Sequence, residues 1–371
     1  MKLLIPGPVT TQASVRAALA VDLAPWDPDT LPLYTGLGER LRAIAGGRDG
    51  THVTLALPGC GHFVIEAAIR SLIPPGGKLL IPMTGAYGER MEHLARAAGR
   101  VPVVLPVPAD APADPAAVAA ALRADPAITH VGLVYSETGT GVVHDPSAIG
   151  AAVRACGRRL ILDAVSAFGA LPLDLKAQPE LDAVLFTANK CLEGVPGAAF
   201  AVARAEPLET GAARAESWSL DLADVLAHAR RGGTGLARFT PPIQVLNALS
   251  VALDLFDAEG GQAARLARYQ ANLRVLSAGM RALGLSLCLP EAAQGPIVLN
   301  VHAPADPAWD LQAFVAALKR RGFLISNFYN TPQPSFRLGC IGALTPEDMR
   351  AAVAAIGATL DDLGIRERAP G

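Results

Sequence analysis

The decisive stretch of this chain reads Thr187-Ala188-Asn189-Lys190-Cys191-Leu192-Glu193-Gly194-Val195-Pro196-Gly197. It lies between two apolar runs, 181–186 and 198–203, which predict buried strands. Lys190 stands alone in a loop of small residues after the first run. Burial lowers the pKa of an amine and leaves it nucleophilic toward an aldehyde, so Lys190 is a candidate Schiff-base lysine. The alternative is a solvated loop lysine, because most loop lysines are exposed.

Length and composition indicate a folded protein of two domains. The chain has 371 residues, more than one hydrophobic core usually supports. Its 51% hydrophobic and 18% charged residues argue against disorder. The net charge of −2 gives no electrostatic case for binding nucleic acid or an anionic membrane surface.

Three features predict a cytoplasmic location. No apolar run approaches the ~20 residues that a membrane helix needs. The amino-terminal residues before Pro6 are too few for a signal peptide. The five cysteines are scattered and odd in number, and they predict reduced thiols, with neither a disulfide framework nor a zinc site.

Strand and helix patterns alternate through the first half of the chain. Strands are predicted at 53–57, 78–83, 101–107, 130–135, 159–163, 181–186 and 198–203, and helices at 63–73, 89–98, 115–123 and 146–156. The strands are nearly continuous apolar runs, as expected when helices cover both faces of a sheet. The pattern predicts a mostly parallel, seven-stranded α/β sheet with ligands beyond the carboxyl ends of its strands.

Three segments are predicted along the chain: an amino-terminal arm at 1–14, a large α/β domain at 15–258 and a smaller α+β domain at 259–371. Residues 22–36 are predicted to be an irregular, functional loop. The alternation is lost over 205–242. Long helices are predicted at 243–257 and 262–283, and the small domain carries predicted strands near 297–302, 323–326 and 336–338.

Glycine-rich turns after two strands are candidate cofactor contacts. Pro58-Gly59-Cys60-Gly61-His62 precedes a helix, whose free N–H groups suit a phosphate; the alternative is a plain strand-to-helix turn. This is not the dinucleotide fingerprint GxGxxG, which disfavours nicotinamide binding. In Gly85-Ala86-Tyr87-Gly88-Glu89-Arg90, the tyrosine can lie flat on a planar cofactor, or it is simply half-buried.

Two further strand ends carry polar residues. Thr138 lies in Tyr135-Ser136-Glu137-Thr138-Gly139-Thr140-Gly141, which is suited to a cofactor edge or is a hydrated loop. Asp163 ends an apolar strand and needs a cationic partner such as a protonated pyridine nitrogen, unless it caps the following turn. A phosphate-type turn, an aromatic, a strand-end aspartate and then a lysine follow the order of a pyridoxal phosphate enzyme.

The sequence as a whole resembles the class V, fold-type I aminotransferases. The motifs that carry the resemblance span nearly the whole chain, and they are 5–11, 26–27, 59–62, 85–88, 136–141, 163–169, 189–197, 219–222, 238–242 and 336–342. Each motif is weak by itself, but together and in this order they are specific. Within the family the chain is most similar to the branch that acts on 2-aminoethylphosphonate and pyruvate.

The resemblance implies a role for each matching residue. Lys190 would bind the cofactor covalently and carry the proton, and Asp163 would pair with the pyridinium nitrogen. Tyr87 would stack on the ring and Thr138 would touch its edge. Cys60, Gly61 and His62 would hold the phosphate, with Thr240 reaching across from the partner of a homodimer. Arg337 would bind the substrate's carboxylate or phosphonate, and Trp26 would also contact the substrate.

The sequence departs from the family at three places, one of which is Pro28, where the family usually has Asp or a similar polar residue. The phosphate turn Gly59-Cys60-Gly61-His62 is nearer to the alanine–glyoxylate type than to the phosphonate type. The segment 326–330 lacks the lysine that the family places shortly before the substrate arginine, which removes a cation near the substrate pocket.

The resemblance implies transfer of an amino group from 2-aminoethylphosphonate to pyruvate. One alternative is a lyase of the same branch that releases ammonia from 1-hydroxy-2-aminoethylphosphonate, and another is an alanine– or serine–glyoxylate transaminase. A non-catalytic regulatory module that binds the cofactor is disfavoured because no basic arm precedes Pro6.

Overall fold

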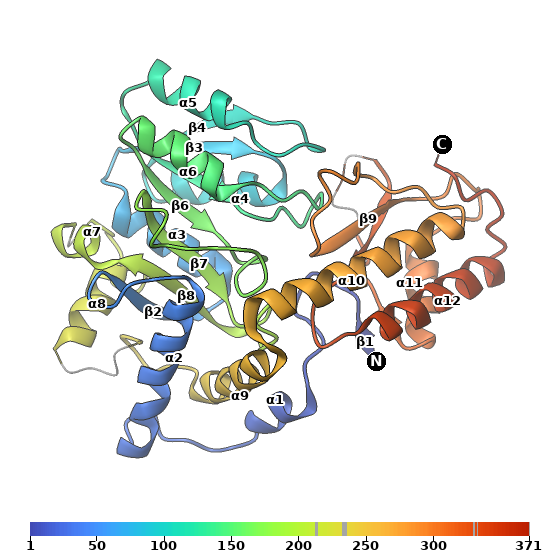
Figure 1. The fold of residues 1–371 in the computed structure, drawn as a ribbon, viewed down its shortest axis with the longest axis horizontal. Helices are drawn as coiled ribbons and strands as arrows, with labels where there is room; N and C mark the ends of the chain where they lie inside the picture. The colour runs from blue at the N-terminus through green and yellow to red at the C-terminus, as the bar shows by residue number, and fades with distance from the viewer. Residues whose placement is uncertain (212–213, 232–235, 329–330, 332, 371) are drawn as a thin grey trace.

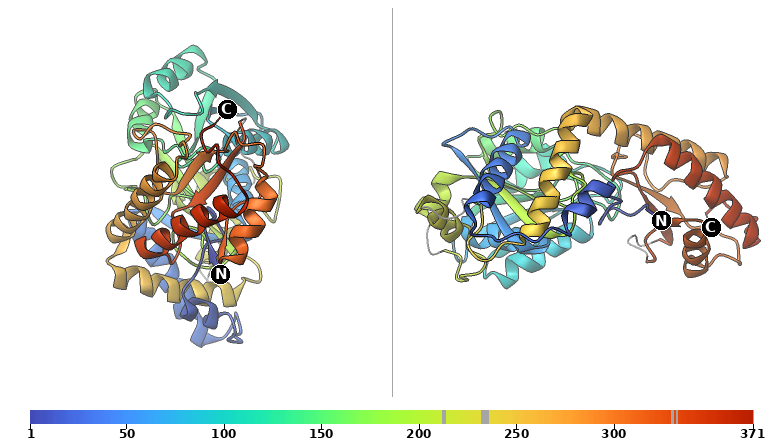
Figure 2. Two further views of the ribbon diagram at one scale, coloured as in Figure 1. Left: turned by 90° about the vertical axis from the view of Figure 1, so that its right-hand side faces the viewer. Right: turned by 90° about the horizontal axis from the view of Figure 1, so that it is seen from below.

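We describe the protein from a computed structural model, which describes residues 1–211, 214–231, 236–328, 331 and 333–370. Figure 1 shows a large lobe, which carries most of the strands, and a smaller lobe that holds the carboxyl-terminal helices. The helix α10 (Gly261–Ala282) runs from one lobe to the other, and the right-hand view of Figure 2 shows the same arrangement. Among the described residues, no helix is long and apolar enough to cross a membrane.

A seven-stranded sheet forms the centre of the large lobe. Its strands are β2 (His52–Gly59), β3 (Lys78–Met83), β4 (Val101–Pro106), β5 (Ile128–Val134), β6 (Arg159–Asp163), β7 (Leu181–Thr187) and β8 (Gly197–Arg204). Their order is β2-β8-β7-β6-β5-β3-β4, and β8 runs antiparallel to both of its neighbours. The prediction of a mostly parallel sheet with seven strands is therefore confirmed.

Helices cover both faces of this sheet, and β7 shows why its sequence is apolar throughout. Val184 and Phe186 pack into the core on one face, together with α2, α5, α6 and α9. Ala183 and Leu185 pack into the core on the other face, together with α3, α4 and α8. The large-lobe helices are α1 (Ala13–Ala18), α2 (Leu31–Ile44), α3 (Gly61–Leu72), α4 (Ala86–Ala97), α5 (Pro115–Ala124), α6 (Pro146–Ala155), α7 (Ala205–Thr210), α8 (Leu222–Arg230) and α9 (Ile243–Glu259).

The small lobe has its own core and two small sheets. The strands β9 (Val298–His302) and β11 (Ser335–Gly339) pair antiparallel, and β10 (Phe323–Leu324) pairs in parallel with the amino-terminal β1 (Lys2–Leu3). The helices α11 (Leu311–Arg320) and α12 (Pro346–Asp362) complete the lobe. The amino-terminal arm is thus attached to the small lobe.

The helix α10 contributes to both lobes. Tyr269 near its start packs in the large-lobe core, whereas Leu276 and Met280 near its end pack in the small-lobe core. A division of the chain at 258/259 stays a prediction, because this helix belongs to both cores.

The structure corrects two expectations about irregular segments. Only part of 22–36 is a loop, because a 3₁₀ turn occupies Pro28–Thr30 and α2 begins at Leu31. The side chain of Asp27 accepts a hydrogen bond from the Asp29 N–H at the start of this turn. The segment 205–242 also contains the helices α7 and α8.

Candidate active site

Two adjoining cavities lie beyond the carboxyl ends of the central strands. The first, of about 300 Å³, is lined by the turn Gly59–His62, by Asp163 at the end of β6 and by Thr187 at the end of β7. The second, of about 620 Å³, extends to the small lobe. Tyr87, Arg90 and Lys190 line both cavities. We call the first the strand-end cavity and the second the interlobe cavity.

Asp163 is a buried carboxylate in the strand-end cavity. Its side chain accepts a hydrogen bond from the Val165 N–H at 2.9 Å, and the residue is only 4% exposed. Burial raises the pKa of this carboxyl to about 6, although the Val165 hydrogen bond and the charges of Arg90 and Lys190 lower it. The site therefore holds an anion that lacks full compensation and suits a cationic ligand atom.

Lys190 lies where the two cavities meet. Its Nζ donates a hydrogen bond to the Pro6 carbonyl at 2.8 Å, so the amino-terminal arm folds against this lysine. Burial above all, with the charges of Arg337 and Arg90, lowers the pKa of the amine to about 8, although Cys191 and Asp163 raise it. Gly7 has a positive φ of 137°, and a β-carbon there would stand 2.4 Å from Lys190 Cδ, so another residue at this position would be strained and would displace the lysine.

The predicted phosphate turn has the geometry that anion binding needs. Cys60 is the N-cap of α3, and no side chain caps the helix there. A β-carbon at Gly61 would stand 2.7 Å from Val165 Cγ2, so the backbone of the first helical turn approaches its neighbour closely. Free N–H groups at such a helix start bind anions. Cys60, Gly61 and His62 all line the strand-end cavity.

The loop after β5 contacts residues that line the cavities. Thr138 lines neither cavity, and its Oγ1 is buried without a hydrogen-bond partner among the described residues. The neighbouring Glu137 is fully buried and accepts hydrogen bonds from the N–H groups of Tyr87 (3.1 Å) and Gly139 (2.9 Å). Burial raises the pKa of Glu137 to about 7. Glu137 therefore anchors the turn that presents Tyr87.

Arg337 is presented to the interlobe cavity from β11. Its Nη1 donates to the Thr138 carbonyl at 2.8 Å and its Nη2 donates to Ser326 Oγ at 3.3 Å. The guanidinium also lies 5.1 Å from the centre of the Phe328 ring. These contacts fix its orientation, so it is preorganised to bind an anion.

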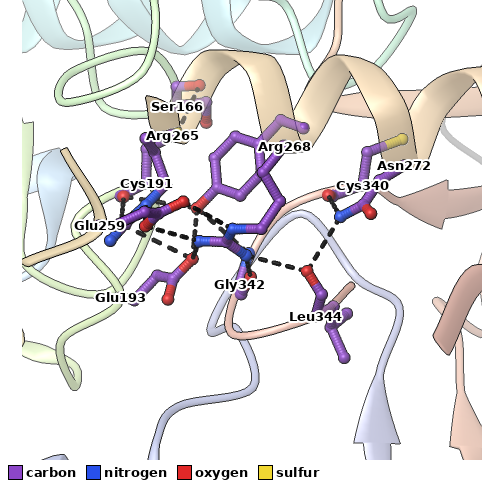
Figure 3. Close-up of polar contacts among 11 residues, drawn as sticks. Ser166, Cys191, Glu193, Glu259, Arg265, Arg268, Asn272, Cys340, Gly342 and Leu344 are labelled. Carbon is purple, nitrogen blue, oxygen red and sulfur yellow. Dashed lines mark hydrogen bonds and ion pairs between the residues drawn. The ribbon is translucent and has the colours of Figure 1, made fainter. Parts of the chain in front are cut away.

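A polar network on α10 connects the Lys190 loop with the loop that follows Arg337 (Figure 3). Arg268 Nη2 pairs with Glu193 at 2.7 Å, and Arg268 Nη1 donates to the Gly342 carbonyl at 2.6 Å. Arg265, which is 1% exposed, donates to the Cys191 carbonyl at 2.5 Å. Side chains of one helix thereby bind both loops.

Trp26 and Thr240 are not brought to this site within one chain. Trp26 is 61% exposed, and Thr240 is also exposed. Neither residue lines the strand-end or the interlobe cavity. The predicted contacts of Trp26 with substrate and of Thr240 with phosphate are therefore not formed within one chain.

Sequence reasoning gave no role to three residues of the site. The guanidinium of Arg90 lies 4.8 Å from the centre of the Tyr87 ring. Glu137 accepts hydrogen bonds from the N–H groups of Tyr87 and Gly139. Lys319 of α11 lines the interlobe cavity, so a cation is present there although 326–330 contains no lysine.

Sequence comparisons point to one family. A model of the family described as aminotransferase class-V matches residues 49–325. The chain is 41% identical over 368 residues to a 2-aminoethylphosphonate–pyruvate transaminase of Cupriavidus necator, which covers 99% of this chain and 97% of that protein. It is 45% identical over 366 residues to the protein of the same name from Burkholderia thailandensis, which covers 99% and 98%.

Solved structures agree with this result. A pyridoxamine–pyruvate aminotransferase from Mesorhizobium loti superposes with a TM-score of 0.89 at 28% identity, covering 99% of this chain and 93% of that one. An alanine–glyoxylate aminotransferase from Nostoc sp. superposes with a TM-score of 0.87 at 25% identity, covering 96% and 94%. The fold type that the resemblance implied is therefore confirmed.

Proposed function

The chain belongs to the class-V aminotransferases, and we propose that it uses pyridoxal phosphate to transfer the amino group of 2-aminoethylphosphonate to pyruvate. The products would be phosphonoacetaldehyde and alanine. The observation that carries the proposal is the position of Lys190, whose amine lies between a cavity that contains a buried carboxylate and a cavity lined by cations.

The strand-end cavity fits pyridoxal phosphate. The uncapped start of α3 suits its phosphate, and the buried Asp163 suits its pyridinium nitrogen. Thr187 lines this cavity, and its Oγ1 is buried without a hydrogen-bond partner among the residues described, as expected of a group that binds a polar ligand atom. When bound, the cofactor supplies an aldehyde and a ring that withdraws electrons.

We assign the proton transfers to Lys190. Its pKa near 8 leaves a sizeable neutral fraction of the amine close to neutral pH, so it can accept the proton from the carbon that carries the substrate's amino group. Asp163, kept apart from water, would hold the positive charge on the ring nitrogen. Tyr87 would cover one face of the ring, and Glu137 fixes the N–H group of this tyrosine.

Arg337 is assigned to the acidic group of each substrate. Its contacts with Thr138 and Ser326 leave it facing the interlobe cavity, where it would pair in turn with phosphonate and carboxylate. Both substrates would thus use one cationic site in succession.

The active form is proposed to be a cytoplasmic homodimer. Thr240 and Trp26 lie exposed and away from the cavities of their own chain, which fits a role in a partner's site. All five cysteines are free, as a reducing compartment would keep them.

An absorbance scan of the purified holoenzyme tests this function. Adding 2-aminoethylphosphonate without a keto acid should change the spectrum of the bound cofactor in a single turnover, and pyruvate should restore it with formation of alanine. No change with this amine would contradict the proposal. The 1-hydroxy derivative should then be added, since release of ammonia without a keto acid would identify the lyase instead.

A further inference from the structure

All charged side chains described in the lining of the interlobe cavity are cationic. Four cationic side chains line it, from Arg90, Lys190, Lys319 and Arg337, and none of its described lining residues is acidic. Lys190 is committed to proton transfer, and Arg90 is shared with the strand-end cavity, where it acts on Asp163. Two cations therefore remain for the acidic group of a substrate, and they come from different elements.

Lys319 is presented by one face of α11. Gln312, Val315, Ala316 and Lys319 all line the cavity, and their spacing puts them on the same side of the helix. The opposite side, with Phe314 and Leu318, packs in the small-lobe core. This core fixes the helix and so directs the lysine toward the cavity.

The ammonium of Lys319 is available to a ligand. Its side chain makes no hydrogen bond or ion pair within the part of the chain that the structure describes. A structural alternative is that it complements the carboxyl end of α11, where cations are favourable. Arg320 lies in the same turn and would serve that purpose equally, but it does not line the cavity.

We propose that Lys319 binds the phosphonate of the amine substrate together with Arg337 and so favours phosphonate over carboxylate; this rests on the proposed function. A planar carboxylate is satisfied by the two parallel N–H groups of one guanidinium. A phosphonate is tetrahedral, has three oxygens and carries up to two charges. One arginine leaves part of that charge unpaired, and a lysine supplies a point charge on a flexible stem.

The test compares three variants of the holoenzyme. Lys319→Met removes the charge and keeps the stem, Lys319→Arg keeps the charge, and Arg320→Met is the matched control. Each is assayed for turnover of 2-aminoethylphosphonate with pyruvate, and for competitive inhibition by ethylphosphonate and by propionate. Lys319→Met should raise the KM for the phosphonate amine and the inhibition constant of ethylphosphonate about tenfold, with kcat and the propionate constant changed less than about twofold.

The controls separate this inference from the proposed function. Lys319→Arg and Arg320→Met should both stay within about threefold of the wild type for ethylphosphonate. Equal weakening of ethylphosphonate and propionate in Lys319→Met, or equal effects of Lys319→Met and Arg320→Met, would overturn the inference. If the wild type fails to turn over 2-aminoethylphosphonate, the proposed function fails, whereas the ethylphosphonate constants still decide whether Lys319 binds a phosphonate.

Discussion

At the scale of single residues, the site holds two groups in the charge state that burial disfavours. Asp163 sits at the end of an apolar strand, and Lys190 follows the next strand in the sheet. Burial raises the pKa of Asp163 and lowers that of Lys190, so the charged form of each is less stable in the folded chain than in water. Groups that lower stability in this way are expected where they are needed for chemistry.

Replacing Lys190 by alanine should abolish turnover. Without its amine the site loses the group assigned to take the proton from the substrate carbon, and loss of general acid–base catalysis alone lowers kcat about 10²- to 10⁴-fold. The measurement is the rate of alanine formation, together with the cofactor absorbance on adding the amine. Lys176→Ala, at an exposed position, is the control and should keep normal turnover. A Lys190→Ala enzyme with unchanged turnover would refute the assignment.

Replacing Asp163 by asparagine should stabilise the cofactor-free protein while it removes activity. The pKa of Asp163 is raised to about 6, so the folded chain binds more protons than the unfolded chain between about pH 4 and pH 6. Wild-type stability therefore falls as pH rises through that window, by about 2–3 kcal/mol from this group. The stability of Asp163→Asn does not fall in this way, so the variant should unfold at a higher denaturant concentration than the wild type at about pH 8. This difference in stability should shrink toward about pH 4.

The control for this measurement is Asp110→Asn, at an exposed position, which should change the free energy of unfolding by less than about 0.5 kcal/mol. A destabilised Asp163→Asn protein at about pH 8 would mean that the carboxylate is well compensated without the cofactor. The reading of Asp163 as an anion that awaits a cationic partner would then be wrong.

At the scale of elements, α10 determines how the Lys190 loop meets the small lobe. Glu193 has a positive φ of 59° and pairs with Arg268 at 2.7 Å (Figure 3). It also accepts a hydrogen bond from the hydroxyl of Tyr269 at 2.7 Å. Arg268 also pairs with Glu259. Because these groups are largely buried, losing one partner leaves the others uncompensated.

Arg268→Ala should therefore lower the free energy of unfolding by about 2–4 kcal/mol. It should also lower kcat, because the loop that holds Lys190 loses its tie to the Gly342 carbonyl. Denaturant unfolding and steady-state rates measure the two effects. Arg274→Ala, at an exposed position on the same helix, should be neutral within about 0.5 kcal/mol. Equal results for the two variants would exclude a special role for the network.

The sequence alone predicted the strands whose two faces both pack against helices. The seven strands were found because residues on both faces of each strand are apolar, as Val184 and Leu185 of β7 illustrate. The start of α2 was missed because Pro32, Gly36 and Gly38 lower helix propensity there. Burial of Tyr34 and Leu37 in the tertiary structure overrides this local preference.

At the scale of the whole molecule, the site depends on contacts that no local pattern records. The motifs around Cys60, Asp163 and Lys190 could be placed because each follows a strand of one sheet. Lys319 could not, because only the packing of α11 in the small lobe turns it toward the cavity. Its spacing with Gln312 is equally typical of a solvated helix face.

The proposed dimer gives a further explanation for residues outside the cavities. Thr240 lies shortly before α9 and is exposed. The resemblance nevertheless implies that it contacts the cofactor phosphate. In a dimer with twofold symmetry, a residue can be remote from its own site and still complete the partner's site. Each active site would then be built from two chains.

Mixed dimers test this arrangement. Thr240→Glu would place a carboxylate against the phosphate and inactivate the partner's site, while Lys190→Ala inactivates its own. In a hybrid of the two variants, the site with Lys190 receives Thr240 from the other chain, so random mixing by co-expression should restore about a quarter of wild-type activity. Lys190→Ala mixed with Asp163→Asn should restore almost none if cofactor sites work independently, because each hybrid has a defect in both sites. No recovery in the first mixture would mean that Thr240 does not act across the dimer.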